Sequence, residues 1–253
     1  MEKVPQAGYK IIGLPMAGIQ RKLTASNLLL PFKILKSLAM AGNVLSQFKP
    51  RAVVGVGGYA SMPVLYKAQQ RGIPVLVQEQ NGYAGLTNKL LARKASAICV
   101  AWPRMERYFP ADRLIFTGNP VRKDIARLKQ LKAEAYHYFD LSPDRRTLLV
   151  LGGSLGARTL NDSLLNGWKK LADAGFQVIW STGKYYYRQL IEVLGEKPHP
   201  QIVLKEFITR MELAYACADV VVSRAGALSI SELCLAGLPV VLVPSPNVAE
   251  AHQ

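Results

Sequence analysis

The sequence has few cysteines and no long apolar run. Cys99, Cys217 and Cys234 form no C-x-x-C pair and have no histidine at metal-ligand spacing, a pattern that argues against a zinc site or a disulfide framework. We interpret them as buried thiols of a protein from a reducing compartment. No stretch reaches the ~20 apolar residues of a membrane-spanning helix, and charged residues, not an apolar segment, follow Met1. We therefore expect no signal peptide, and any contact with a membrane to be at its surface.

Acidic residues are scarce in the first half of the chain. Residues 1–127 hold 19 lysines and arginines against 5 acidic residues, whereas residues 128–253 hold 13 against 12. The net charge of +15 is therefore concentrated in the first half. Such a surface attracts nucleic acid, anionic lipid headgroups or a pyrophosphate-bearing substrate. A generally basic surface with no particular partner is the alternative.

Short β-branched runs alternate with longer amphipathic stretches. Continuously apolar strands separated by helices are typical of parallel sheets buried on both faces. With 253 residues, half of them apolar, the chain is long enough for two cores. The pattern thus predicts an α/β fold with two doubly wound, Rossmann-like domains. The expected strands are Lys10–Leu14, Ala52–Val56, Pro74–Gln78, Ala97–Val100, Leu114–Thr117, Thr147–Leu151, Gln177–Ser181, Gln201–Leu204, Asp219–Val222 and Pro239–Val243.

The two domains are expected at residues 1–123 and 124–253. A charged helical stretch at 124–139 and the polar turn Ser142-Pro143-Asp144 mark the join. Both domains are expected to be incomplete. No glycine-rich loop follows Lys10–Leu14, although a doubly wound domain places a phosphate-binding turn after its first strand. The chain also stops at Gln253, where a helix is expected to begin.

Two glycine-rich turns follow expected strands. Residues 152–158 (GGSLGAR) lead from an apolar strand into a helix, where free N–H groups and the helix dipole favour a phosphate; a tight turn that needs glycine is the alternative. Residues 55–61 (GVGGYAS) form a similar turn. With Glu79 about 20 residues later, Gly55, Gly57 and Ala60 imitate a dinucleotide-binding fingerprint, which is weak support when it stands alone.

Polar residues at three other strand ends are candidate ligand contacts, because open α/β sheets bind ligands at the carboxyl ends of their strands. Residues 78–82 (QEQNG) could also be a solvated loop. Arg122, in GNPVR at 118–122, suits a phosphate, although an exposed arginine without a role is equally compatible. Glu232 follows the strand end at 223 and lies on an otherwise apolar helix. If buried, it needs a partner, and paired ribose hydroxyls would supply one; a surface role is the alternative.

Five segments together match one known family in order and spacing. They are GVGGYAS at 55–61, EQNGYAGLTNK at 79–89, GNPVR at 118–122, GGSLGAR at 152–158 and SRAGALSISE at 223–232. They resemble the MurG family, bacterial transferases that convert lipid I to lipid II in peptidoglycan synthesis, along essentially the whole chain. The resemblance implies a GT-B fold, with two domains facing a cleft. It also implies inverting transfer of GlcNAc from UDP-GlcNAc to the MurNAc 4-hydroxyl of lipid I.

The resemblance also implies roles for individual residues. The diphosphate of UDP-GlcNAc would contact Ser154 and the phosphate loop of Gly152, Gly153 and Gly156, and Ala227, Leu228 and Ser229 would lie at the phosphate and sugar. The uracil would contact the backbone of Ile208, and the ribose would contact Glu232. Asn81 and Arg122 would approach the donor from the N-terminal side, and Gln253 would contact the GlcNAc. The loop of Gly57, Gly58 and Tyr59 would meet the acceptor pyrophosphate. No metal or cofactor is expected, and the sequence has no Asp-x-Asp motif.

One departure from the family affects the chemistry. Members begin with a Gly-Gly-Thr-Gly-Gly-His loop, which is absent from this sequence, and no match to it is found at His137, His199 or His252. The later part of the C-terminal domain is absent too. The catalytic base is therefore unassigned, and we expect the chain by itself to be poorly active or inactive.

The basic half gains a more specific interpretation from the family. Residues 20–23 and 28–36 mix apolar and cationic side chains, and the matching region of the family rests on the inner membrane. Phe32 and Leu35 are expected to contact lipid. Arg21, Lys22, Lys33 and Lys36 are expected to contact anionic headgroups. The resemblance thus implies a peripheral protein on the cytoplasmic face of the cell membrane, although an ordinary amphipathic helix packed on its own sheet is the alternative.

Other functions fit the sequence less well. A UDP-GlcNAc 2-epimerase would share the fold but need neither a lipid acceptor nor a membrane surface. A nucleic-acid-binding module would explain the basic half, yet no recognised motif or aromatic stacking surface supports it, and no nucleic acid is expected as a partner. A dinucleotide-dependent oxidoreductase rests only on the imitation fingerprint.

Overall fold

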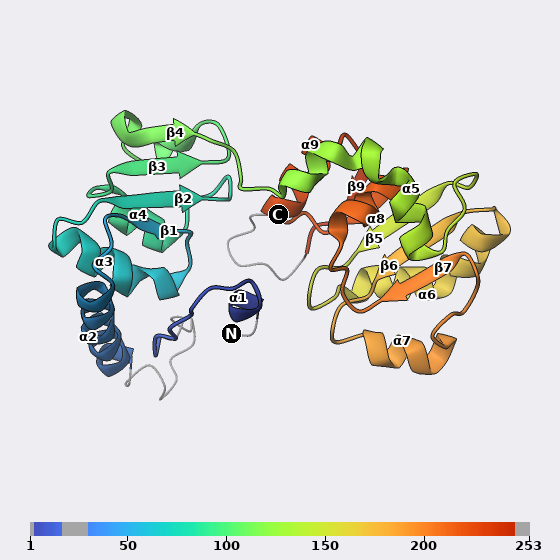
Figure 1. Ribbon diagram of the computed structural model, residues 1–253, viewed down its shortest axis with the longest axis horizontal. Helices are drawn as coiled ribbons and strands as arrows, with labels where there is room; N and C mark the ends of the chain where they lie inside the picture. Colours follow the sequence, from blue (N-terminus) through green and yellow to red (C-terminus); the bar gives the residue numbers. More distant parts are fainter. Residues whose placement is uncertain (1–2, 17–29, 246–253) are drawn as a thin grey trace. The chain divides into compact units, whose positions relative to one another are not determined.

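The computed structural model describes residues 3–16 and 30–245, which divide into two compact units (Figure 1). The first unit ends at Asn119 and the second begins at Pro120. The division lies a few residues before the predicted boundary at 123/124, and it assigns Arg122 to the second unit. Each unit is an α/β structure around a parallel sheet, which confirms the predicted fold class.

The first unit contains a four-stranded parallel sheet in the order β1-β2-β3-β4. Its strands are β1 (Val53–Gly55), β2 (Val75–Glu79), β3 (Ala97–Val100) and β4 (Leu114–Phe116). Its helices are α1 (Lys3–Gln6), α2 (Leu30–Phe48), η2 (Tyr59–Ser61), α3 (Met62–Gln70), α4 (Leu86–Ala92), η3 (Met105–Arg107) and η4 (Ala111–Arg113). Val77 and Ile98 are fully buried partners on neighbouring strands at the centre of the core.

The predicted strand at Lys10–Leu14 is wrong. Residues 9–16 are irregular, and Tyr9 and Ile12 are more than half exposed. A strand needs a neighbour that completes its backbone hydrogen bonds, and none of the described strands pairs with this segment. The apolar run, interrupted by Gly13 and Pro15, has a strand-like composition without the partner that a strand requires.

The second unit contains a five-stranded parallel sheet in the order β7-β6-β5-β8-β9. Its strands are β5 (Thr147–Leu151), β6 (Gln177–Ser181), β7 (Ile202–Lys205), β8 (Val220–Ser223) and β9 (Val240–Leu242). Its helices are η5 (Lys123–Arg127), α5 (Leu128–Phe139), α6 (Arg158–Asp173), α7 (Tyr187–Leu194), α8 (Met211–Cys217) and α9 (Ala227–Ala236). The chain winds outward from β5 in one direction and then resumes at β8 in the other, so a topological switch point lies between β5 and β8.

Alternate residues of the central strands pack on opposite faces of this sheet. Leu149 and Ile179 belong to a core that includes residues of α5 and α8, whereas Val150 and Trp180 belong to a core that includes residues of α6 and α7. Both faces are therefore buried, which explains the continuous apolar runs of the sequence. Because side chains on both faces of each central strand are packed in a core, the strands are held in place, and so are the loops that begin at their carboxyl ends.

Replacing a central core residue should destabilise this unit. Leu149 is fully buried in the core that includes α5 and α8. We expect Leu149→Ala to lower the free energy of unfolding by about 2–5 kcal/mol, because it leaves a cavity. Val193 is exposed on α7, so Val193→Ala should stay within ~0.5 kcal/mol of the parent. Chemical unfolding followed by circular dichroism measures both, and equal stabilities would contradict the assignment of Leu149 to the core.

Candidate functional site: a pocket at the switch point of the second unit

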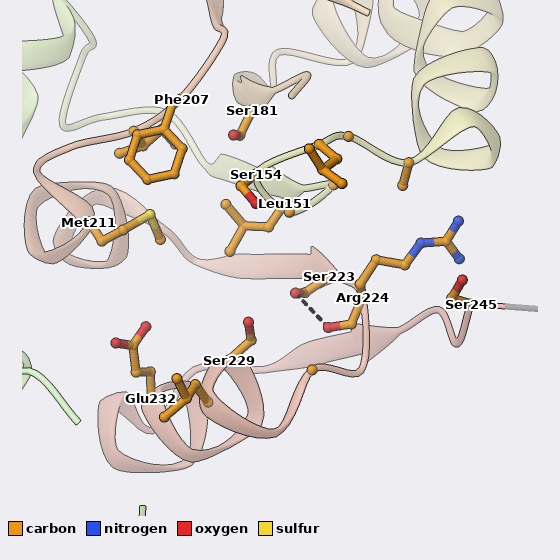
Figure 2. Close-up of a pocket in the computed structure, with 18 of the residues that line it drawn as sticks. Leu151, Ser154, Ser181, Phe207, Met211, Ser223, Arg224, Ser229, Glu232 and Ser245 are labelled. Atoms are coloured by element: carbon orange, nitrogen blue, oxygen red, sulfur yellow. Dashed lines mark hydrogen bonds between the residues drawn. The ribbon is translucent and has the colours of Figure 1, made fainter. Parts of the chain in front are cut away.

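A pocket of about 770 Å³ lies at the switch point of the second unit, within the size range of small-molecule sites. Its walls come from the carboxyl ends of β5, β6 and β8 and from the first turns of α6 and α9 (Figure 2). The residues that line it include Arg122, Leu151, Gly152, Gly153, Ser154, Gly156, Ser181, Phe207, Ile208, Met211, Tyr215, Ser223, Arg224, Leu228, Ser229 and Glu232. Residues that are distant in the sequence thus form one concave site.

The glycine loop after β5 packs on the backbone that follows β6. Gly156 has φ of +93°, and a Cβ at this position would collide with the carbonyl oxygen of Thr182 and the ring of Tyr186. A Cβ at Gly183 would collide with the backbone of Gly156. Hydrogen bonds from Lys184 N–H to Ser154 C=O and from Tyr185 N–H to Leu155 C=O tie the segments together. Glycine is therefore required here for close backbone approach as well as for its conformation.

The same bonds leave N–H groups of the loop free. The carbonyls of Gly153, Ser154 and Leu155 accept hydrogen bonds. Among the residues that the structure describes, nothing accepts one from the N–H of Ser154 or Leu155. Ser154 is exposed at the tip of the loop, and its hydroxyl faces the pocket (Figure 2). An anion in the pocket would find unoccupied donors.

Two helices begin at this pocket. The helix α6 starts after Ala157 and α9 starts after Gly226; neither cap makes a side-chain hydrogen bond, and neither first turn contains an acidic residue. Their initial N–H groups and dipoles therefore carry partial positive charge that no side chain of the helix neutralises. Such helix N-termini are suited to bind phosphate.

Glu232 is the acidic side chain of the pocket, and it is nearly buried. Nη1 of Arg122 lies 2.9 Å from one carboxylate oxygen and 3.2 Å from the other. The hydroxyl of Tyr215 donates to the second oxygen at 3.0 Å. Burial, and then the Glu232 carboxylate, raise the pKa of Tyr215 well above its ordinary value, so the phenol remains a donor. A carboxylate at the edge of a pocket, held by two donors, can accept hydrogen bonds from ligand hydroxyls.

Arginines outnumber acids around the pocket. Arg122, Arg158 and Arg224 line it with Glu232, which gives a positive balance. The guanidinium of Arg224 donates to the carbonyls of Val243 and Pro244 at 3.2 and 2.8 Å. It therefore ties β8 to the segment after β9, on the far side from Glu232 (Figure 2). The positive charge of Arg224 contributes to the electrostatic potential in the pocket, while its hydrogen bonds stabilise the local structure.

An apolar corner lies beside Glu232. Phe207, which is 42% exposed, and Met211 form this side of the pocket (Figure 2). The side chain of Ile208 is buried in the core, so only its backbone is available to a ligand. A flat ring with polar edges fits a site of this kind, because an apolar wall and backbone amides lie side by side.

The structure brings most of the predicted donor-site residues together. Arg122, Ser154, Ile208, Leu228, Ser229, Glu232 and the three loop glycines line the pocket. Ala227 begins α9 between lining residues, Asn81 belongs to the first unit, and Gln253 lies outside the described residues. The expectation that Arg122 approaches from the N-terminal domain is not met, because Arg122 belongs to the second unit. Tyr215 and Met211, which lie on α8, also line the pocket and were not predicted. The only signal for Tyr215 in the sequence was the need of a buried Glu232 for a donor.

In the first unit, Glu79 organises the loop after β2. Only 3% exposed, it accepts hydrogen bonds from the N–H and the amide of Asn81, the N–H of Gly85 and the amide of Asn88, at 2.8–3.4 Å. Protein donors thus surround both oxygens. A dinucleotide-binding acid must instead face a ribose, so the imitation fingerprint at Gly55 is not supported by the geometry.

The predicted acceptor loop of the first unit is open. Gly57 and Gly58 have φ of +88° and +76°, and no atom lies within 4 Å of a Cβ placed at Gly58. Tyr59 is 53% exposed, while Ser61 closes the turn through a hydrogen bond from its hydroxyl to the carbonyl of Gly58 at 2.8 Å. The loop is therefore a fixed turn with an accessible rim.

The cysteines differ from the prediction in one case. Cys217 is buried, and burial raises the pKa of its thiol to about 12, which makes it a poor nucleophile. Cys99 is partly buried. The expectation of a buried thiol is wrong for Cys234, which lies on the exposed side of α9. Within the described part of the chain, no three His, Cys, Asp or Glu side chains are grouped to hold a metal ion.

Comparison with protein-family models defines the class. Residues 1–100 match the glycosyltransferase family 28 N-terminal domain, and residues 147–253 match the glycosyltransferase family 28 C-terminal domain. Each match lies within one of the two units, and most of the residues that line the pocket belong to the C-terminal match. The fold and the pocket are thus those of a hexosyltransferase of family 28.

Curated relatives narrow the class further. The chain is 54% identical to UDP-N-acetylglucosamine–N-acetylmuramyl-(pentapeptide) pyrophosphoryl-undecaprenol N-acetylglucosamine transferases of Parabacteroides distasonis and Cytophaga hutchinsonii, over the whole chain and 69% and 68% of those proteins. The chain thus spans about two thirds of their length. Acinetobacter baumannii MurG has a similar structure, with a TM-score of 0.63 and 31% identity over 91% of this chain and 64% of that one. The chain belongs to the MurG family.

A second group of solved structures shares only the fold. UDP-GlcNAc 2-epimerase from Neisseria meningitidis, bound to UDP-GlcNAc, gives a TM-score of 0.61 at 17% identity over 88% of this chain and 66% of that one. Identity this low shows a common architecture and carries no statement about the reaction. The epimerase alternative is therefore a fold relative.

A matched pair of glycine substitutions tests the close packing of the loop. Gly153 and Gly156 both have positive φ, but only the Cβ of an alanine at 156 would meet backbone atoms. We expect Gly153→Ala to cost about 1–2 kcal/mol from the backbone conformation alone. Gly156→Ala should cost clearly more, because the nearest atom to the added Cβ is the backbone carbonyl oxygen of Thr182, which cannot repack. Thermal unfolding measures both, and equal losses would show that close packing adds nothing.

Proposed function

We propose that the protein transfers GlcNAc from UDP-GlcNAc to the MurNAc 4-hydroxyl of lipid I, with inversion at the anomeric carbon, and so forms lipid II. The observation that carries the proposal is the pocket of the second unit, which combines free loop N–H groups, two helix N-termini and the carboxylate of Glu232. A nucleoside diphosphate sugar presents the complementary groups. The names of the close relatives support the same donor and acceptor.

In this proposal the diphosphate, ribose, uracil and sugar of UDP-GlcNAc would each contact a different wall of the pocket. The diphosphate would accept hydrogen bonds from the loop at Ser154 and from the first turns of α6 and α9. The ribose hydroxyls would donate to Glu232. The uracil would lie against Phe207 and Met211 and bond the backbone of Ile208. Leu228 and Ser229, at the start of α9, would border the sugar.

The reaction requires a good leaving group. The acceptor oxygen forms a bond to the anomeric carbon, and the bond from that carbon to the UDP oxygen breaks. UDP leaves with the electron pair, and the acceptor hydroxyl passes its proton to a general base. The residues of this chain would stabilise the departing diphosphate, because preorganised N–H donors and arginines face the place where its charge develops.

The first unit would supply the acceptor side. The open turn of Gly57, Gly58 and Tyr59 offers backbone donors and an accessible phenol for the acceptor pyrophosphate. Asn81 is held by Glu79, so its position is fixed before a substrate binds. We propose that it reaches the nucleotide sugar from this unit.

Removal of the Glu232 charge should weaken donor binding. We expect Glu232→Gln to reduce the affinity for UDP and UDP-GlcNAc by roughly tenfold or more, since a charged hydrogen bond contributes ~1.5–3 kcal/mol. NAD should give no heat with either protein. Calorimetric titration measures this, with Glu192→Gln as control because this exposed residue of α7 lies outside the pocket. Unchanged UDP affinity in Glu232→Gln would refute the proposed ribose contact.

We also propose that the protein is peripheral on the cytoplasmic face of the cell membrane, through α2. Phe32 and Leu35 are 70% and 64% exposed, and Lys36 lies on the same exposed face. Lys33 is partly buried at the border of this face, while Arg21 and Lys22 lie outside the described residues. Exposed apolar side chains rimmed by cations favour an anionic lipid surface. The described residues contain no helix long and apolar enough to span a bilayer.

Charge reversal on α2 should release the protein from vesicles. Each lysine near an anionic surface contributes ~1 kcal/mol, so loss of two lysines alone should weaken binding by roughly thirtyfold. Lys33→Glu with Lys36→Glu should weaken it by more than this, because the two glutamates also repel the anionic surface. Co-sedimentation with phosphatidylglycerol-containing vesicles measures the loss. The matched control is Lys129→Glu with Lys170→Glu, which makes the same charge change on α5 and α6 of the second unit. Equal loss in both pairs would attribute binding to net charge and not to α2.

A further inference from the structure

The ion pair in the pocket occupies the carboxylate that a ribose would need. Arg122 approaches both oxygens of Glu232, at 2.9 and 3.2 Å, while Tyr215 approaches one of them. Donation of two ribose hydroxyls to this carboxylate therefore competes with the guanidinium. A ligand that displaces Arg122 must compensate for the loss of a charged hydrogen bond.

A released guanidinium needs a new anion. Arg122 lines the same pocket as the loop of Ser154 and the start of α9, where the proposed function places the diphosphate. A nucleoside offers hydroxyls to Glu232 but no anion to Arg122. A nucleoside diphosphate offers both, so it can exchange one charged contact for another.

We infer that Arg122 is a specificity-determining residue that exchanges Glu232 for the donor diphosphate, so that the pocket accepts nucleoside diphosphates and discriminates against nucleosides. This inference rests on the proposed function and adds to it the way in which one ion pair couples recognition of the ribose to recognition of the phosphates. Tyr215 supports the exchange, because its hydrogen bond leaves the buried carboxylate with a donor while Arg122 moves.

The backbone of Arg122 is held, so that only its side chain needs to move. On one side, Asn119 exchanges hydrogen bonds with the side chain of Gln78 and the carbonyl of Gln80. On the other side, the N–H of Ile125 donates to the carbonyl of Arg122 at 3.3 Å, and Ile125 is buried in the core. The side chain of Arg122 is 46% exposed. It can therefore swing without breaking a packed interface and remain at the pocket.

The test compares uridine, UDP and inorganic pyrophosphate by calorimetric titration of the whole chain and of Arg122→Gln. In the parent protein, UDP should bind far more tightly than uridine, and pyrophosphate should raise uridine affinity roughly fivefold or more, the lower range of ordinary coupling. In Arg122→Gln, uridine should bind more tightly than in the parent, because its competitor is absent. UDP should bind less tightly, and pyrophosphate should no longer affect uridine.

Two further variants separate this exchange from a general effect of charge. Lys123→Gln removes the neighbouring cation, which does not line the pocket, and should leave the uridine and UDP affinities as in the parent. Arg122→Lys keeps a cation without the paired geometry and should restore part of the coupling to pyrophosphate.

The outcomes distinguish the inference from the function on which it rests. If the parent protein does not bind UDP, the proposed donor site is refuted. If UDP binds but Arg122→Gln lowers uridine affinity or leaves it unchanged, only the exchange is refuted, and Arg122 is a simple ligand contact. A rise in uridine affinity with loss of coupling supports the exchange.

Discussion

The close contact between the glycine loop after β5 and the backbone after β6 is the constraint on which the pocket depends. Gly156 and Gly183 meet with no room for a side chain on either. This contact directs the carbonyls of the loop toward the protein and leaves N–H groups at the pocket. The starting points of α6 and α9 follow from the strand order, because β5 and β8 are neighbours whose connections run in opposite directions. Backbone geometry thus creates the anion site, and side chains add to it.

Two buried carboxylates have different environments and therefore different roles. Glu79 is surrounded by backbone and amide donors from its own loop, so it maintains local structure. Glu232 has the donors of one phenol and one half-exposed guanidinium, and it borders a cavity. Burial alone would not separate them. The difference between the two carboxylates is whether a hydrogen-bond donor can be replaced by a ligand without leaving the buried charge unsatisfied.

The sequence predicted nine of the described strands to within a residue or two, because buried parallel strands leave continuous apolar runs between helices. It was wrong at Lys10–Leu14, where the composition fits a strand but none of the described strands pairs with the segment. Ser154 and Glu232 were predicted as site residues from their places after strand ends. Tyr215 was not, since its contact with Glu232 depends on how α8 packs against α9. The unit that holds Arg122 also could not be predicted from a motif, because it depends on contacts made in the folded chain. Arg122 pairs there with Glu232, 110 residues later in the sequence.

The glycine loop has a consequence for inhibition. A compound that accepts hydrogen bonds from the backbone N–H groups near Ser154 would contact atoms that an amino-acid substitution cannot delete. The usual escape, insertion of a larger side chain, is limited at Gly156 because the added atoms would strike backbone. Contacts to the side chains of Phe207 or Met211 lack this protection. Resistance should therefore arise more readily against ligands that depend on the base-binding corner than against those that depend on the loop.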